Sequence, residues 1–497
     1  MGGRRLAVLL ATIVTSVAAL TGCTTPAATP SGPALTVGFT LEPPTLDPTT
    51  SDSAAIPQLL LYNVYETLVK MDSSGKIQPL LATDYAVSGD GKVYTFHLDP
   101  KAKFASGTPV DANAVVSGIN RMRNAASGTI KAQMAIISDV QVTAADTVQV
   151  TLSRPSNFWI YDMTSTAGII VDPAVTDMAT TPMGSGPYQL GTWVKGDSIT
   201  LVKNPAYWGT AANFDQVTFR YIPDANAMIA AMASSELDII GQMTSPDALS
   251  MFSDKAIYTI ISGVTNGEVV LGFNHTNPAL ANRSVRQAIC HAIDRQGLVD
   301  TVWGGQGRLI GSMVVPTDPY YQDLSGAYPY DPAKAKTLLA AAGVKDLTLR
   351  LRVPVLPYAT PAATYIASQL ADVGIKVTVE ELDFNSRWLP EVFMSGDYDM
   401  TIVAHMEPRD IVAFANPDYY WHYDNPDFQA QIKAADAAAP ADFIPLMQKA
   451  AQTLTTDAAA DWLFDFPNLV VARAGITGIG DNATTLSFDL TTIESKG

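Results

Sequence analysis

The stretch with the most chemically reactive side chains is "YDMTIVAHMEPRD", in which an apolar run gives way to a group of charged and titratable residues. These residues are His405, Glu407, Arg409 and Asp410. A carboxylate can bind an ammonium group through charge-assisted hydrogen bonds, and the planar arginine fork matches a carboxylate. The cluster therefore has the chemistry to bind both poles of a zwitterion. The same residues are equally typical of a solvated loop, in which surface ion pairs form among them and contribute little.

The residues before this cluster predict a series of alternating helices and strands. Asp331 and Pro332 are suited to begin a helix, and Gly343 is suited to end it. The elements that follow are a strand at 347–353, a helix at 361–372, a strand at 375–381, a helix at 386–394 and a strand at 398–404. Right-handed crossovers make such strands parallel. The reactive cluster then lies at the carboxyl edge of a sheet, where ligands commonly bind.

The start of the chain is typical of a secretory signal, with a basic beginning and a mainly apolar run at Leu6–Leu20. This run is shorter than the roughly 20 residues needed to cross a bilayer. Its ending, "LTGC", resembles a bacterial lipobox, which predicts a signal peptide at 1–22 and lipidation of Cys23. An ordinary signal peptide is the alternative. Residues 23–33 are rich in Thr, Pro and Ala, and we expect a flexible tether there.

Composition excludes some classes of protein and limits others. The net charge of −17 disfavours nucleic-acid binding. Cys290 is the only cysteine besides Cys23, so the mature chain can form no internal disulfide and must gain its stability from packing. At 497 residues the chain is too long for a single core, and we expect two or three domains.

Four blocks of sequence resemble the family 5 solute-binding proteins of ATP-driven importers, a group that contains oligopeptide, dipeptide and nickel receptors. The blocks occur in the order found in the family, and the resemblance extends over nearly the whole mature chain. They are "PPTLDPTTSD" with the "LYNVYETLV" and "IQPLLATDYAVSGDGKVYTFHLDPKAKFASGTPVDANAVV" that follow it, "MGSGPYQLGTWVKGDSITLVKNPAYWG", "SVRQAICHAIDRQGLV" and "YDPAKAKTLLAAAG".

The resemblance implies an α/β, class II periplasmic-binding-protein-like fold of three lobes. In such a fold the ligand cleft lies between lobes I and III, and hinge motion closes it. The implied ranges are 34–55, 186–272 and 470–497 for lobe I, 56–185 for lobe II and 273–469 for lobe III.

The resemblance also implies where ligand binds. In peptide-binding members, an aspartate shortly after the lobe III strand captures the amino terminus of the peptide, usually behind a tryptophan. This chain differs, because His405 lies at or near the tryptophan position and Pro408 lies near the aspartate position. Glu407 and Asp410 are the acids that remain. The expected ligand-binding residues are Asp52, Asn274, His405, Met406, Glu407, Arg409, Asp410 and Trp421.

We therefore expect a monomeric, membrane-anchored receptor that is not an enzyme and needs no cofactor. It would capture a small peptide or peptide-like zwitterion and deliver it to a membrane permease driven by ATPase subunits. One alternative is a receptor for nickel or another chelated metal, with ligands from His405, His422, Glu407 and Asp410. A second is an exported lipoprotein hydrolase, although the sequence contains no His-Glu-x-x-His and no Gly-x-Ser-x-Gly.

Overall fold

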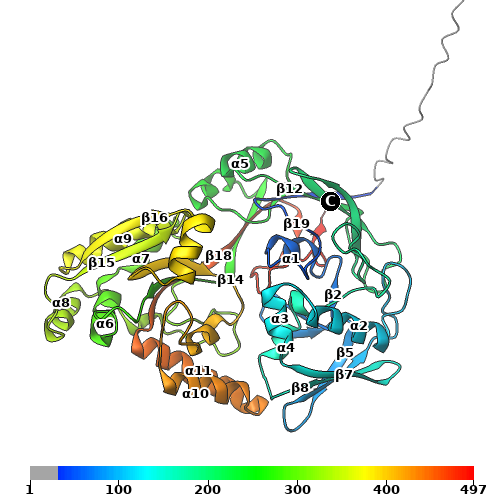
Figure 1. The fold of residues 1–497 in the computed structure, drawn as a ribbon. Helices are drawn as coiled ribbons and strands as arrows, with labels where there is room; N and C mark the ends of the chain where they lie inside the picture. The colour runs from blue at the N-terminus through cyan, green and yellow to red at the C-terminus, as the bar shows by residue number, and fades with distance from the viewer. Residues whose placement is uncertain (1–31, 497) are drawn as a thin grey trace, which may run out of the picture.

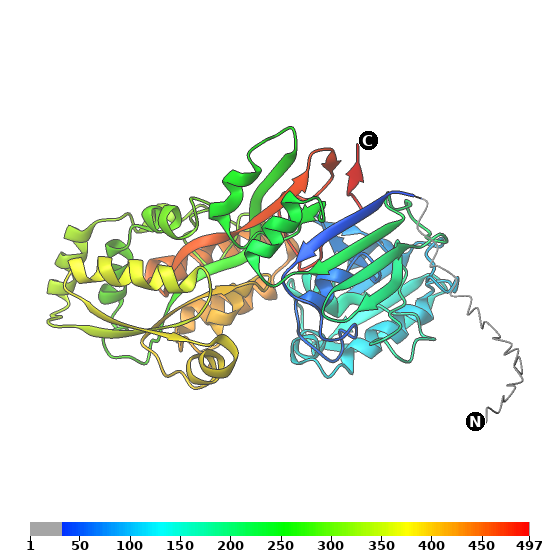
Figure 2. The same ribbon diagram turned by 90° about the horizontal axis from the view of Figure 1, so that it is seen from above.

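The computed structural model describes residues 32–496. The predicted signal peptide, most of the predicted tether and Cys23 lie outside these residues. Within the described range, no helix has both the length and the apolar character that crossing a membrane requires. The chain forms two bodies joined by long strands, with residues of roughly the predicted lobes I and II in one body and lobe III in the other (Figures 1 and 2).

A ten-stranded mixed sheet extends through both bodies. In spatial order, its strands are β10 (Tyr188–Val194), β11 (Ser198–Lys203), β12 (Gln216–Tyr221), β1 (Ala34–Phe39), β13 (Ile239–Ile240), β18 (Ala460–Arg473), β14 (Tyr258–Phe273), β17 (Met400–His405), β15 (Thr348–Pro354) and β16 (Lys376–Leu382).

Strands β14 and β18 join the two bodies, as Figure 2 shows. They are antiparallel and pair from Tyr258 with Arg473 to Gly272 with Ala460. The pairing is interrupted between Val264 and Glu268. Because irregular pairing bends a strand and loosens its ladder, this interruption is where we expect the bodies to hinge.

The predicted helix–strand series of lobe III is confirmed. Helix α8 (Pro332–Ala341) begins at the predicted Asp331, whose side chain accepts a hydrogen bond from the Lys334 N–H at 2.9 Å. Helix α9 (Ala359–Asp372) and η4 (Phe384–Met394), a π-type helix, connect strands β15, β16 and β17. Strand β15 is parallel to both β16 and β17, as the crossover rule predicts.

Strand β17 is apolar because both faces of the sheet are covered there. Met400 and Ile402 pack into one hydrophobic core, which includes residues of α9, α6 (Arg283–Ala292) and α7 (Arg295–Val302). Val403 packs into a second core on the other face, with residues of α10 (Pro426–Asp436) and α11 (Pro440–Asp457). A strand buried on both sides is a continuous apolar run rather than an alternating one. Apart from the buried Thr401, whose hydroxyl donates a hydrogen bond to the Arg352 carbonyl at 2.6 Å, its polar side chains emerge where the strand ends.

The other body has one large core that fills lobe II and continues into strands β1, β10, β11 and β12 of lobe I. Lobe II contains an antiparallel sheet of β5 (Ala82–Val87), β6 (Val93–Leu98), β8 (Thr147–Leu152) and β7 (Ile137–Ala144). Three smaller pairings are β2 (Glu66–Thr67) with β9 (Ile169–Ile170), β3 (Val69–Met71) with β4 (Ile77–Pro79), and β19 (Ile476–Thr477) with β20 (Glu494–Ser495).

The remaining helices of this body lie around the two sheets (Figure 1). They are α1 (Ala55–Leu60), α2 (Ala112–Arg123), α3 (Gly128–Met134), α4 (Trp159–Asp162), η1 (Thr166–Gly168), α5 (Ala225–Ala233) and η2 (Pro246–Phe252). Lobe III also contains the short η3 (Ser325–Ala327) and η5 (Asp410–Ala415), the second of which begins within the reactive cluster.

Candidate functional site

A cavity of about 860 Å³ lies between lobe II and lobe III. One wall comes from lobe II, including α3, α4 and the chain at 154–158, and the opposite wall comes from 406–415 and α10 of lobe III. Two parts of lobe I, 51–54 and 484–486, complete the lining. Its volume lies within the roughly 300–1,000 Å³ typical of sites for small ligands.

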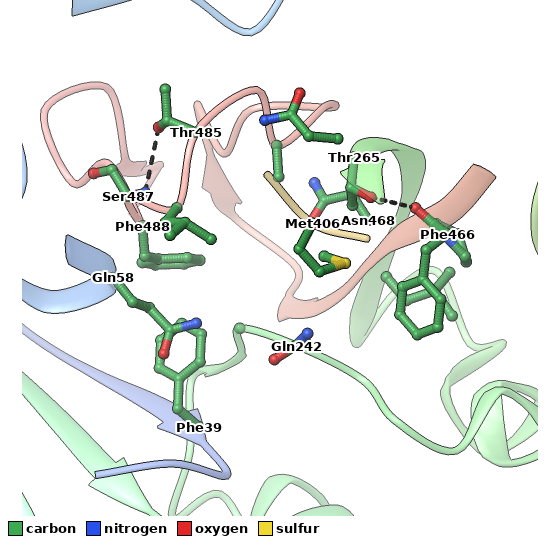
Figure 3. A pocket seen from close by; sticks show the side chains of 16 residues that line it. Phe39, Gln58, Gln242, Thr265, Met406, Phe466, Asn468, Thr485, Ser487 and Phe488 are labelled. Atoms are coloured by element: carbon green, nitrogen blue, oxygen red, sulfur yellow. Dashed lines mark hydrogen bonds between the residues drawn. The ribbon is translucent and has the colours of Figure 1, made fainter. Parts of the chain in front are cut away.

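A smaller cavity of about 100 Å³ lies at the crossing strands, and Figure 3 shows it. Gln58 and Gln242 approach it from the body formed by lobes I and II, and Met406 approaches it from lobe III. On the right in this view, the Thr265 hydroxyl donates a hydrogen bond to the Phe466 carbonyl at 2.7 Å. Met406, like 485–486, lines both cavities, so the two are neighbouring parts of one cleft.

Buried His405 lies behind the cavity wall and orients its neighbours. Its Nδ1 lies 3.2 Å from Asp410 Oδ2, and its Nε2 lies 2.9 Å from the Tyr420 hydroxyl. Its ring packs against Trp421, with ring centroids 4.9 Å apart. The hydrogen bond to Tyr420 and the packing against Trp421 hold the imidazole in place, and Asp410 lies beside its other nitrogen. His405 does not line the cavity, whereas Asp410 does.

Glu407 presents a free carboxylate to the cavity. Among the described residues, its side chain has no hydrogen-bond or ion-pair partner within the structure, and solvent reaches it through the cleft. Protein surrounds the group on most sides, and this desolvation raises its pKa; Asp410 raises it further, while His405 lowers it. A cation that entered the cavity would offset both effects that raise the pKa. Glu407 is therefore poised to bind a positively charged group.

Arg409 faces the other lobe. Its backbone is left-handed (φ 64°), and its guanidinium carbon lies 3.5 Å from the centre of the Tyr161 ring of lobe II. Within residues 32–496 it forms no salt bridge, and its buried Nε has no partner. The surface-pairing interpretation of this cluster is consequently wrong, because Arg409 stacks on Tyr161 instead of pairing with Glu407 or Asp410.

The other expected residues divide into two groups. Asp52 and Met406 line the cavity, and Asp52 accepts a hydrogen bond from the Ser127 hydroxyl. Asn274 and Trp421 do not line it. The Asn274 amide donates to the carbonyls of Gly396 and Tyr398 at 3.0 and 2.9 Å, and Trp421 stacks on Phe414 with centroids 3.9 Å apart. Both are buried inside lobe III, where Asn274 satisfies backbone groups and Trp421 fills the core.

Several charged or aromatic residues of the cavity were not expected from the sequence. Tyr161, Asp162 and Arg154 come from lobe II, and Lys433 comes from α10. Burial raises the pKa of Asp162 to about 7, although the charge of Arg409 opposes this rise. No local motif marks these residues. The only available signal was the pair of charges, Arg154 and Asp162, on either side of the buried Trp159.

Three side chains of the cluster can hold a metal ion. His405, Glu407 and Asp410 each offer one ligand atom, and these atoms lie within 4.8 Å of one another. One imidazole nitrogen with two carboxylate oxygens suits a divalent transition metal. His422, the second histidine considered, is not in this group.

Two bodies joined by two long strands, with a cleft between them, form the architecture of a solute-binding protein. The family model for bacterial extracellular solute-binding proteins, family 5, matches residues 76–425, and the chain belongs to this family. Members of the family are the solute-binding components of ABC importers, which pass their solute to a permease and its ATPase. The expected α/β binding-protein fold and the expected family are thus confirmed. The cleft was expected between lobes I and III, whereas the larger cavity lies mainly between lobes II and III, with lobe I supplying only a small part of its lining.

Relatives and solved structures agree with this assignment. The glutathione-binding protein GsiB of Salmonella paratyphi A is 28% identical over 352 residues, which cover 69% of this chain and 68% of the relative. NikA from Brucella suis, solved with Fe(III)-EDTA, aligns with a TM-score of 0.82 and 23% identity over 93% of this chain and 100% of that one. DppA from Helicobacter pylori, solved with the peptide STSA, aligns with a TM-score of 0.77 and 21% identity over 94% of this chain and 98% of that one.

Proposed function

We propose that this protein captures a short peptide or peptide-like zwitterion in the cleft between its lobes. The observation that carries this proposal is the pair Glu407 and Arg409, two opposite charges two residues apart that both reach the cavity without an ion-pair partner among the described residues. A ligand ammonium group would bind at Glu407 and Asp410, and a ligand carboxylate would bind at Arg409. Lys433 adds a further positive charge to the lining.

The relatives support a ligand of this class. GsiB binds glutathione, and the Helicobacter pylori DppA structure contains a peptide. Both ligands are peptides with charged groups. We also propose that the function involves binding without chemical change, in keeping with a family of solute-binding proteins.

We propose further that the protein is exported and tethered to the outer face of the cell membrane through lipid on Cys23. The support is the small-residue pair before Cys23 at the end of an apolar run, together with a family whose members are extracellular. Residues 24–33 would then give the receptor reach to meet a permease.

Mass spectrometry of ligand released from the purified protein tests this function. We expect an unmodified solute with both an amino and a carboxylate group. Recovery of a solute that lacks these charges would contradict the proposed recognition. Turnover of peptides added to the protein would contradict its non-enzymatic nature and favour the hydrolase alternative.

A second candidate is a receptor for a chelated metal, which the grouping of His405, Glu407 and Asp410 within 4.8 Å favours. Elemental analysis of the same purified protein distinguishes the two candidates. A stoichiometric transition metal that His405→Ala removes would support the second candidate. A metal-free protein that retains an organic zwitterion would support the first.

A further inference from the structure

A loop of lobe II and the end of helix α10 in lobe III are bonded across the cleft. Asp436, the last residue of α10, is 6% exposed, and within the described part of the chain its carboxylate receives hydrogen bonds only from lobe II. The Ser156 hydroxyl donates to Oδ1 at 2.6 Å and the Phe158 N–H donates to the same atom at 3.2 Å. The Arg154 guanidinium pairs with Oδ2.

Asn157 adds a second set of bonds between the same segments. Its side-chain amide donates to two carbonyls at the end of α10, those of Ala435 and Asp436, at 3.0 and 3.2 Å, and to the Ala438 carbonyl just beyond the helix at 2.9 Å. Its backbone N–H also donates to the Asp436 carbonyl at 2.8 Å. The last carbonyls of a helix have no partner within the helix. A side chain of lobe II therefore caps a helix of lobe III.

The contact also forms part of the cavity wall. Arg154, Ser156, Phe158 and Asp436 all line the cavity, and the Phe158 ring meets the edge of Phe443 on α11 with centroids 5.5 Å apart. A ligand chain that passed out between the loop and the helix would have to break these hydrogen bonds. The wall is thus closed on this side by the protein itself.

We infer that residues 154–158 and the end of α10 form a latch that holds lobes II and III together and limits the length of the ligand. Every bond in the latch is made by protein groups, so it stabilises closure to the same extent for any solute. Glu407 and Arg409, by contrast, would select a solute by its charge. The length limit rests on the proposed function, while the closing role does not.

Hydrogen exchange in the mature full-length chain tests the closing role. The Asn157 N–H reports lobe separation even in Asp436→Ala, because it bonds to the backbone of Asp436 and not to its side chain. Loss of charge-assisted bonds to a buried carboxylate should accelerate this exchange at least about tenfold. Asn157→Ala leaves the buried carboxylate paired. This variant should also accelerate the hydrogen exchange of the N–H of residue 157.

Asp427→Ala is the matched control, since it removes an exposed carboxylate from the first turn of the same helix. It should leave the exchange unchanged. Unaltered exchange at residue 157 in both latch variants would overturn the latch. The melting temperature of each variant shows whether it is folded.

A pool of synthetic alanine peptides, from the dipeptide to the octapeptide, tests the length limit. The wild type and the variants are incubated with the pool, and mass spectrometry identifies the peptides that each retains. We expect the latch variants to retain longer peptides than the wild type. The same length distribution in all proteins would overturn the limit. Faster exchange with no peptide retained by any protein would support the closing role and contradict the proposed function.

Discussion

The buried carboxyl of Glu66 links lobe II to a motif of lobe I and should make the stability of the protein depend on pH. Glu66 lies in β2 and is 1% exposed. The Tyr207 hydroxyl donates to its Oε1 at 2.7 Å and the Trp208 indole N–H donates to its Oε2 at 3.0 Å. Both donors belong to the sequence "NPAYWG". The motif therefore supplies polar partners for an acid inside the shared core.

Burial raises the pKa of Glu66 from 4.5 to about 7, even though these hydrogen bonds oppose the rise. The folded state then binds a proton more tightly than the unfolded state. The proton on Glu66 therefore stabilises the folded protein fully at pH values below the pKa of the unfolded state. This stabilisation is lost as the pH rises through the pKa of the folded state. A rise of this size corresponds to about 3.5 kcal/mol, at about 1.4 kcal/mol per unit.

Replacing Glu66 with Gln should remove this dependence, because the amide is neutral at every pH. Its oxygen can accept from Trp208 and its NH₂ can donate to the Tyr207 oxygen. Urea unfolding of both proteins between about pH 4.5 and pH 8 measures the effect. As the pH rises across this range, the free energy of unfolding of the wild type should fall by about 3 kcal/mol relative to that of the variant.

Glu381→Gln is the matched control, since Glu381 is exposed at the end of β16. The free energy of unfolding of this control should change with pH as that of the wild type does. Equal pH dependence in Glu66→Gln and the wild type would refute the reasoning, because it would mean that the buried carboxyl is not protonated in the folded protein.

Three further predictions concern the anchor and the cavity. Cys23→Ala should move the protein from the membrane fraction to the soluble fraction; full retention, with no lipid labelling of the wild type, would contradict the tether. Arg409→Ala should weaken binding of a carboxylate ligand by about 1.5–3 kcal/mol in calorimetry, with a smaller loss for the amidated ligand. Because the pKa of Asp162 is raised to about 7, its carboxylate charges as the pH rises through that value, and a cationic ligand should bind more tightly at about pH 7.5 than at pH 5.5. Asp162→Asn should reduce this difference, and an unchanged difference would exclude the residue from the ligand site.

Local signals were sufficient to predict much of lobe III from the sequence. Asp331, Pro332 and Gly343 determine the ends of α8 through short-range effects. The apolar run of β17 reflects burial on both faces, and crossover handedness then determines the direction of its neighbours. These features depend on residues close in sequence. The end of β17 was therefore correctly expected to lie at a cleft, while ligand binding there stays a prediction.

The opposite wall of the cleft could not be predicted in the same way. Tyr161 meets Arg409 across nearly 250 positions of the sequence, and only the packing of two lobes brings them together. Asn274 and Trp421 were expected to bind ligand but do not line the cavity, and the reason is related. Polar and aromatic residues near a strand end are equally suited to satisfying backbone groups or filling a core, and the sequence alone does not distinguish these roles.

Calorimetric titration of Glu407→Gln tests most directly the claim that the end of β17 recognises ligand charge. The ligands are the solute recovered from the purified protein and its N-acetylated form, with Glu381→Gln as the control variant. Loss of one charge-assisted hydrogen bond should weaken binding of the free amine by about 1–3 kcal/mol and leave the acetylated form little affected. The melting temperature should stay close to that of the wild type. Equal losses for both ligands, or a collapse in stability without any selectivity, would contradict the account.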